Sequence, residues 1–169
     1  MLRLLGAALL FGGLSLAGCS AGAELRRRTT LLRELVGALE QIQRELSFRL
    51  TPLPELFENQ SRRSTGTLTE FFKACAGHAR SFEYPFEEGW RREVEGLSSL
   101  VDTQVRECLE RLGRNLGRCD GDGERELLNA SVDELKEYLG RSEEENRQRG
   151  RLYSVLGVTA GAFFSILLL

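Results

Sequence analysis

The chain is poor in the residues that metal and catalytic sites most often use. Its 169 residues include one histidine, His78, and four cysteines that form no C-x-x-C pair. A metal centre needs several such ligands at short spacing, so the sequence predicts no metal site. It also lacks a P-loop, a dinucleotide-binding fingerprint and a nucleophile elbow. We therefore predict no catalytic residue and no bound cofactor.

Two further absences narrow the class of protein. No segment alternates apolar and polar residues with the period of two that a half-buried strand requires, so no sheet is expected. The 23 basic and 25 acidic residues nearly balance. No basic stripe with interleaved aromatic residues lies outside short arginine clusters. The composition thus indicates an all-α protein without a nucleic-acid partner.

Two local patterns suggest chemistry but have simpler explanations. Asp120 begins an acidic, glycine-containing run that resembles a calcium loop. Its sixth and twelfth positions are Arg125 and Ser131, where an EF-hand needs glycine and a bidentate acid. Cys75 and His78 lie three residues apart on an apolar helical face, but no carboxylate close in sequence could orient the histidine. Packing is the better explanation for the pair.

Long, nearly uncharged runs lie at both ends of the sequence. Residues 2–23 contain one charge, Arg3, and residues 152–169 contain none. A helix needs about 20 apolar residues to cross a bilayer core. We predict transmembrane helices at 1–23 and 152–169, which flank a helical soluble domain at 24–151.

Arginines on the inner borders of these runs predict the orientation. The two clusters are Arg26, Arg27 and Arg28, and Arg147, Arg149 and Arg151. Basic residues close to a span stay on the cytoplasmic side. The soluble domain of a two-span cell-membrane protein is therefore predicted in the cytoplasm.

The run Leu16-Ala17-Gly18-Cys19 offers a different topology, because it reads like the lipobox of a bacterial lipoprotein. Cleavage before Cys19 would export the domain on a lipid anchor. The arginine run that begins at Arg26 resists export. We favour two spans and keep as the alternative an exported lipoprotein that acts as an extracytoplasmic structural or binding module.

Apolar spacing predicts a bundle of about six helices between the spans. Five apolar residues, three and four apart, define the first helix, from Leu25 to about Phe48; they are Leu32, Leu35, Leu39, Ile42 and Leu46. Pro52 and Pro54 end this helix and begin the next, with Thr51 as the expected cap. The later helices are expected at about 53–60, 67–80, 85–97 and 103–116 and from about 124.

Six segments, in order and at this spacing, resemble the stage III sporulation protein AB family of endospore-forming bacteria. They are Met1–Ala7, Leu32–Glu40, Arg44–Phe48 leading into Thr51–Glu55, Glu87–Trp90, Leu116–Asp120 and Arg151–Val158. The resemblance implies a non-enzymatic component of the membrane channel that joins mother cell and forespore. It implies residence in the outer forespore membrane, with the domain facing the mother-cell cytoplasm.

The resemblance also implies partners. The family's helical domain is similar to the cytoplasmic domains of type II secretion platform proteins, which contact a cytoplasmic ATPase. The expected partners are the channel's ATPase, stage III sporulation protein AA, and other stage III channel proteins. We expect the irregular turn at 117–123, with Arg118 and Asp120, to form the docking loop. Trp90 is a further candidate contact, although a core position is favoured for it.

Overall fold

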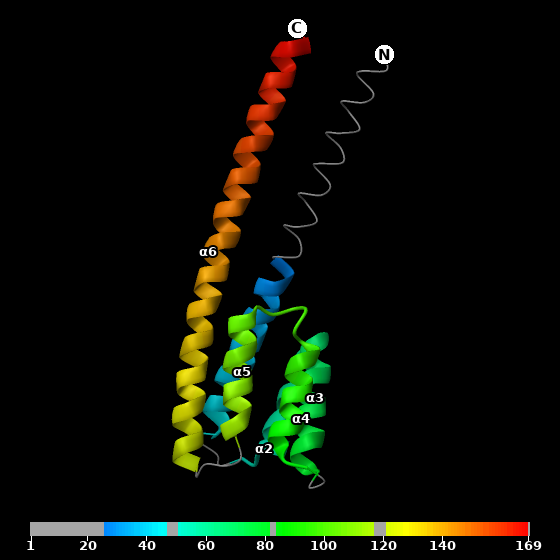
Figure 1. Cartoon of the computed structure of the whole chain (residues 1–169), viewed down its shortest axis with the longest axis vertical. Helices are drawn as coiled ribbons and strands as arrows, with labels where there is room; N and C mark the ends of the chain where they lie inside the picture. The colour runs from blue at the N-terminus through cyan, green and yellow to red at the C-terminus, as the bar shows by residue number, and fades with distance from the viewer. Residues whose placement is uncertain (1–25, 47–50, 82–83, 117–120, 169) are drawn as a thin grey trace. The chain divides into compact units, whose positions relative to one another are not determined.

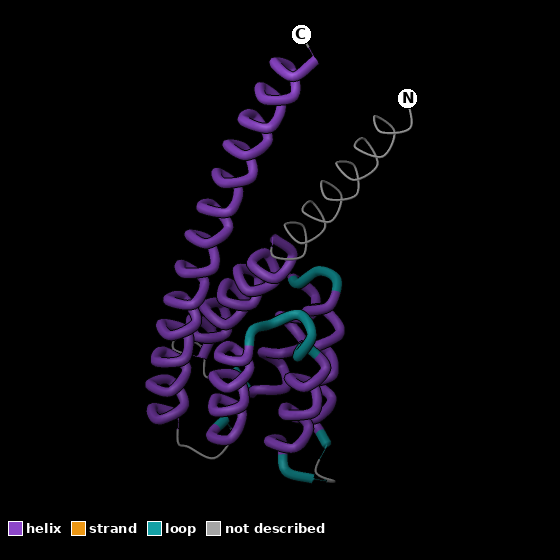
Figure 2. Tube along the Cα trace, turned by 45° about the horizontal axis from the view of Figure 1, so that its top comes forward, coloured by secondary structure: helices purple, strands orange, loops and turns teal. Residues whose placement is uncertain are grey.

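The computed structural model describes residues 26–46, 51–81, 84–116 and 121–168 (Figures 1 and 2). Its helices are residues 26–46, α2 (Leu53–Arg63), α3 (Thr67–Arg80), α4 (Phe86–Gly96), α5 (Thr103–Asn115) and α6 (Gly121–Leu168). These ranges contain no strand. The all-α class and the number of helices are therefore confirmed. Within α6, the side chains from Arg125 to Arg149 are described.

Proline sets the start of α2, as the sequence predicts. The carbonyl of Pro52 accepts hydrogen bonds from the backbone N–H groups of Glu55 and Leu56, at 3.0 and 3.1 Å. The expected cap by Thr51 is wrong, because the N-cap position falls on Pro52 and no side chain caps the helix. The helix also continues past the predicted end to Arg63.

The contacts within the chain divide it into two compact units. One unit is Thr30–Leu139 and the other joins Met1–Thr29 with Gly140–Leu169. In the first unit, α2 packs on α3, α3 on α4 and α4 on α5.

The predicted leucine seam of the first helix lies in the core of the Thr30–Leu139 unit. All five seam residues are at most 6% exposed, and α6 contributes Leu128, Val132 and Leu135 to the same core. Lys136 Nζ lies 2.8 Å from Glu40 Oε1, and Arg125 Nη2 donates to the Leu46 carbonyl at 3.1 Å. The two helices are therefore antiparallel, and Arg125 satisfies a carbonyl at the end of the first helix.

Trp90 of α4 is the largest fully buried side chain of this unit. Its ring centroid lies 5.8 Å from that of Phe57, 5.4 Å from that of Phe71 and 5.8 Å from that of Phe86. Its indole N–H donates to the Leu109 carbonyl of α5 at 2.7 Å. One side chain thus contacts α2, α3 and α5 from α4, and its polar atom is satisfied as burial requires.

Gly113 makes room for this indole. A Cβ on Gly113 would overlap Cδ1 of Trp90. Gly113 follows Leu109 by four residues, one helical turn, so a side chain there would stand beside the carbonyl that the indole reaches. The absence of a side chain at Gly113 therefore permits the hydrogen bond.

In the other unit, a polar cluster joins the start of the first helix to α6. Asn146 Nδ2 donates to Thr29 Oγ1 at 2.6 Å, and Thr29 Oγ1 is also hydrogen-bonded to Ser142 Oγ. Thr29 is buried, with 4% of its surface exposed. We call Thr29, Ser142 and Asn146 the polar clasp.

Over the stretches that the structure describes, no helix has both the length and the apolar character of a membrane span. The predicted span at 1–23 lies outside the described residues. For 152–169, the backbone is described as far as 168 but the side chains are not. Both spans therefore stay predictions.

Replacing Gly113 tests the fit to Trp90. We expect Gly113→Ala to lower the free energy of unfolding by about 1–3 kcal/mol, because the new methyl group overpacks the core. The matched control is Gly77→Ala, where a Cβ meets nothing within 4 Å; it should raise stability by up to about 1 kcal/mol. Urea unfolding followed by the fluorescence of Trp90, the single tryptophan, measures both. Equal effects would contradict the fit.

Candidate functional site

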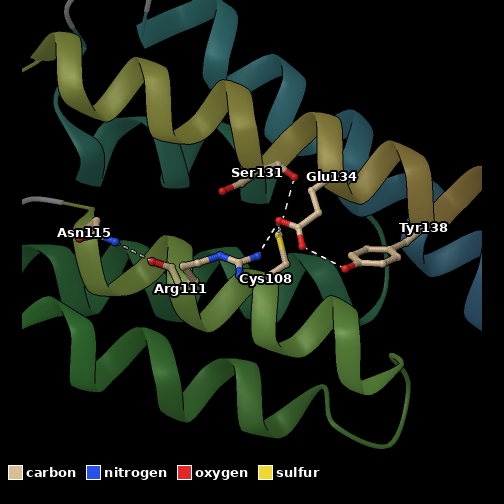
Figure 3. A network of polar contacts seen from close by, with 6 residues as sticks. All are labelled: Cys108, Arg111, Asn115, Ser131, Glu134 and Tyr138. Atoms are coloured by element: carbon tan, nitrogen blue, oxygen red, sulfur yellow. Dashed lines mark hydrogen bonds and ion pairs between the residues drawn. The ribbon is translucent and has the colours of Figure 1, made fainter.

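A network of polar side chains links α5 to α6 (Figure 3). Arg111 Nη2 and Glu134 Oε2 form an ion pair at 2.5 Å. The Tyr138 hydroxyl donates to Glu134 Oε1 at 3.0 Å, and Cys108 Sγ lies 3.6 Å from Glu134 Oε2. Asn115, the last residue of α5, donates to the Arg111 carbonyl at 3.0 Å. Glu134 is the common partner that joins the two helices.

Helical spacing places these side chains together. Cys108 and Arg111 are three residues apart on α5, and Glu134 and Tyr138 are four apart on α6, so each pair shares one helix face. Cys108 points into the core with no exposed surface. The side chains of Arg111 and Glu134 are 48% and 34% exposed. The network therefore runs from the core to the surface.

The surroundings fix the protonation states of the network. Burial alone would raise the pKa of Glu134, but hydrogen bonds from Tyr138 and Arg111 outweigh it and lower that pKa. Burial, followed by the charge of Glu134, raises the pKa of the Cys108 thiol to about 11. The hydrogen bond to Glu134 raises the pKa of Arg111. Near neutral pH the site thus presents an ion pair on its surface and a protonated thiol beneath it.

The Cys75 and His78 pair has the orienting carboxylate that the sequence did not reveal. His78 Nε2 lies 2.9 Å from Glu93 Oε1, and the Tyr84 hydroxyl lies 2.6 Å from His78 Nδ1. Cys75, however, has no exposed surface, and burial followed by the charge of Glu93 raises its pKa well above the usual range. Burial therefore disfavours the thiolate that a nucleophile requires, and the packing interpretation fits the pair.

Trp90 lies where the sequence analysis favoured it, in the core. Its side chain is 1% exposed, so it offers no indole surface to a partner. This burial argues against Trp90 as a direct partner contact. The other two candidate contacts, Arg118 and Asp120, lie outside the described residues.

The arginines that predict topology lie in the Met1–Thr29, Gly140–Leu169 unit. Arg26 and Arg27 are exposed and Arg28 is half-buried at the start of the first helix. Two arginines on α6 pair with acids of the preceding turn: Arg147 with Glu144 at 3.0 Å, and Arg149 with Glu145 at 3.9 Å. The side chain of Arg151 is outside the description.

The Thr30–Leu139 unit is an all-helical bundle around one leucine- and aromatic-rich core. The protein-family model described as stage III sporulation protein AB matches residues 3–169, so the chain belongs to that family. Membership confirms the resemblance and supports a sporulation-related role.

A solved structure named stage III sporulation protein AB has the same fold, with a TM-score of 0.65 at 16% sequence identity. The likeness covers 72% of this chain and 97% of that one. No curated protein sequence matches the chain.

Lowering the pH tests the charge of Glu134. Because its folded-state pKa is lowered, its stabilising effect is present above the usual carboxyl value of about 4.3 and is lost as the pH falls through the folded value. We expect Glu134→Gln to lower stability at pH 7 by less than about 1 kcal/mol, because the pair is partly exposed. The difference from the wild type should disappear towards about pH 2.

Urea unfolding at a series of pH values, followed by Trp90 fluorescence, measures this difference. The control is Glu126→Gln on an exposed position of the same helix, which should track the wild-type protein. A deficit of Glu134→Gln that is the same at every pH would show that shape, and not charge, stabilises this contact.

Proposed function

We propose that this protein is a non-enzymatic, membrane-anchored assembly or coupling component of the channel complex that joins mother cell and forespore. Its two apolar segments hold the helical domain at the outer forespore membrane, on the mother-cell side. The domain docks the cytoplasmic ATPase of the complex, stage III sporulation protein AA. Support comes from the family match, which spans both apolar segments and the helical domain.

The observation that carries the docking proposal is the partly exposed Arg111–Glu134 ion pair. Its two residues come from different helices, and the carboxylate of Glu134 is also held by the Cys108 thiol and the Tyr138 hydroxyl. Charges fixed on a packed surface give a partner specificity and a faster encounter. The pair therefore serves as a recognition element for a partner of complementary charge pattern.

The proposed docking loop is continuous in sequence with this network. Asn115 ends α5 and bonds to the Arg111 carbonyl, and Arg118 and Asp120 follow within five residues. A partner could therefore bind the loop and the network together. The proposed docking residues are Arg118 and Asp120 of the loop, with Arg111 and Glu134 of the network.

Attachment at both ends suits a coupling role. A domain tethered by two spans stays at the membrane surface and has a high effective concentration against a membrane-held complex. A weak contact with the ATPase is then sufficient for docking, and a partly exposed ion pair can supply such a contact.

A charge swap tests the docking pair without removing its attraction. The variant Arg111→Glu/Glu134→Arg keeps opposite charges in contact but reverses their positions. We expect binding of the full chain to the ATPase to weaken by roughly tenfold, because the partner meets the wrong pattern of charge. Co-purification and titration with the purified ATPase measure it, and the thermal midpoint reports whether the variant folds.

The matched control is Glu40→Lys/Lys136→Glu. This pair also joins α6 to a neighbouring helix, and its side chains are 32% and 47% exposed, close to those of the docking pair. It should leave ATPase binding unchanged. Equal binding by both swaps would remove the α5–α6 surface from the proposal, and the Arg118→Glu/Asp120→Lys variant would then test the loop alone.

Topology separates this proposal from the exported-lipoprotein alternative. Glu144 has a half-exposed side chain, so Glu144→Cys provides a label site in a chain that also carries Cys119→Ser and keeps Cys19, on which the lipoprotein alternative depends. The same chain without Glu144→Cys is the control. Cys75 and Cys108 have no exposed surface and can stay. A membrane-impermeant maleimide should label this site only after cell lysis. Labelling of intact cells would place the domain outside and exclude direct contact with a cytoplasmic ATPase.

A further inference from the structure

The polar clasp brings the two arginine clusters to one place. Thr29 lies directly after Arg26, Arg27 and Arg28 in the first helix, and Asn146 directly precedes Arg147 in α6. The contact between Thr29 and Asn146 is 2.6 Å long. The clasp therefore connects the two helices directly beside the two clusters.

The direction of the two helices places both clusters on the same side of the clasp. The helix of residues 26–46 runs away from Arg26 toward Thr29, whereas α6 runs from Ser142 past Asn146 toward Arg149. Thr29 contacts both Ser142 and Asn146. At about 1.5 Å of rise per residue, Arg26 and Arg149 each lie within roughly one turn of the clasp. On each helix the arginines lie between the clasp and an apolar segment in the sequence.

The α6 arginines are available for other partners. Arg147 and Arg149 pair with Glu144 and Glu145 of the same helix, but their side chains are 72% and 61% exposed. Exposed ion pairs of this kind are weak: they favour the paired over the unpaired arginine by only roughly twofold. Guanidinium groups bind phosphate oxygens in a bidentate way. The weak exposed pairs with Glu144 and Glu145 leave the two arginines able to do so.

We propose that Arg26, Arg27, Arg147 and Arg149 form one composite site for the phosphate headgroups of anionic phospholipids, and that the polar clasp assembles it. The inference rests on the membrane anchoring proposed above. Arginines near an anionic leaflet each strengthen binding, by roughly fivefold at low salt. Held at one level by the clasp, the four act on the same layer of headgroups and bind it multivalently.

The lipid preference of the reconstituted chain tests the composite site. The full chain is reconstituted in phosphatidylcholine vesicles that contain a trace of spin-labelled phosphatidylglycerol or spin-labelled phosphatidylcholine. The ratio of the two motionally restricted fractions measures preference for the anionic headgroup. We expect a severalfold preference in the wild type, weakened by salt. It should fall to near one in the fourfold variant with Arg26, Arg27, Arg147 and Arg149 each changed to Gln.

The decisive variant is Thr29→Ala, with Thr30→Ala as its matched control on the adjacent, exposed position. Thr29→Ala should lower the preference by roughly two- to fivefold, because the arginines no longer act together, while Thr30→Ala should leave it unchanged. Equal preference in both variants would overturn the composite site. The thermal midpoint of each variant shows that the domain is folded.

Carbonate extraction of the same vesicles separates this inference from the proposed function. A chain that resists extraction but shows no headgroup preference is anchored without the site, so only this inference fails. A chain that carbonate removes is not an integral membrane protein, so the anchoring proposal fails with it. Equal competition by inorganic phosphate and by phosphatidylglycerol would show a general phosphate site and overturn the assignment to lipid.

Discussion

The fit of the Trp90 indole against Gly113 is the constraint on which the helical bundle depends. A tryptophan fills a large volume, and here the same ring contacts aromatic side chains of α2 and α3 while its N–H is satisfied by the Leu109 carbonyl of α5. Loss of the ring leaves a cavity, and loss of the bond to the carbonyl leaves an unsatisfied buried donor. Both changes destabilise a core. The relative positions of four helices therefore depend on one residue without a side chain.

This constraint reaches the candidate docking surface through α5. Leu109 and Gly113 face Trp90, while Cys108 and Arg111 lie toward α6. A change in the contact between the Trp90 indole and Gly113 would move α5, and it would therefore change the distance between Arg111 and Glu134. The core thus positions the surface ion pair, and the surface pair contributes little to holding the core, because exposed ion pairs are weak. A docking variant can therefore change recognition and leave the fold intact.

Local periodicity explains which features the sequence could predict. The leucine seam, the proline at the start of α2 and the number of helices follow from spacing within one segment, and the structure confirms them. The partners of His78 and Arg111 do not, because Glu93 and Glu134 lie on other helices, 15 and 23 residues away. Gly113 reads in sequence as a weak helix position. The need for glycine at this position becomes clear only in the folded structure, where Trp90 of another helix packs against it.

The first helix has apolar residues along its seam but a buried polar residue, Thr29, near its start. This difference has a physical reason. A seam of similar leucines stabilises a helix pair but tolerates a shift of one turn, because each leucine can occupy its neighbour's place. Thr29 is buried and hydrogen-bonded to Ser142 and Asn146, and a shift would leave these groups unpaired at a cost of about 1–3 kcal/mol. Buried polar contacts of this kind fix register. Here the register determines which arginines lie together, so the clasp links the packing of two helices to the charge that the chain presents beside its apolar segments.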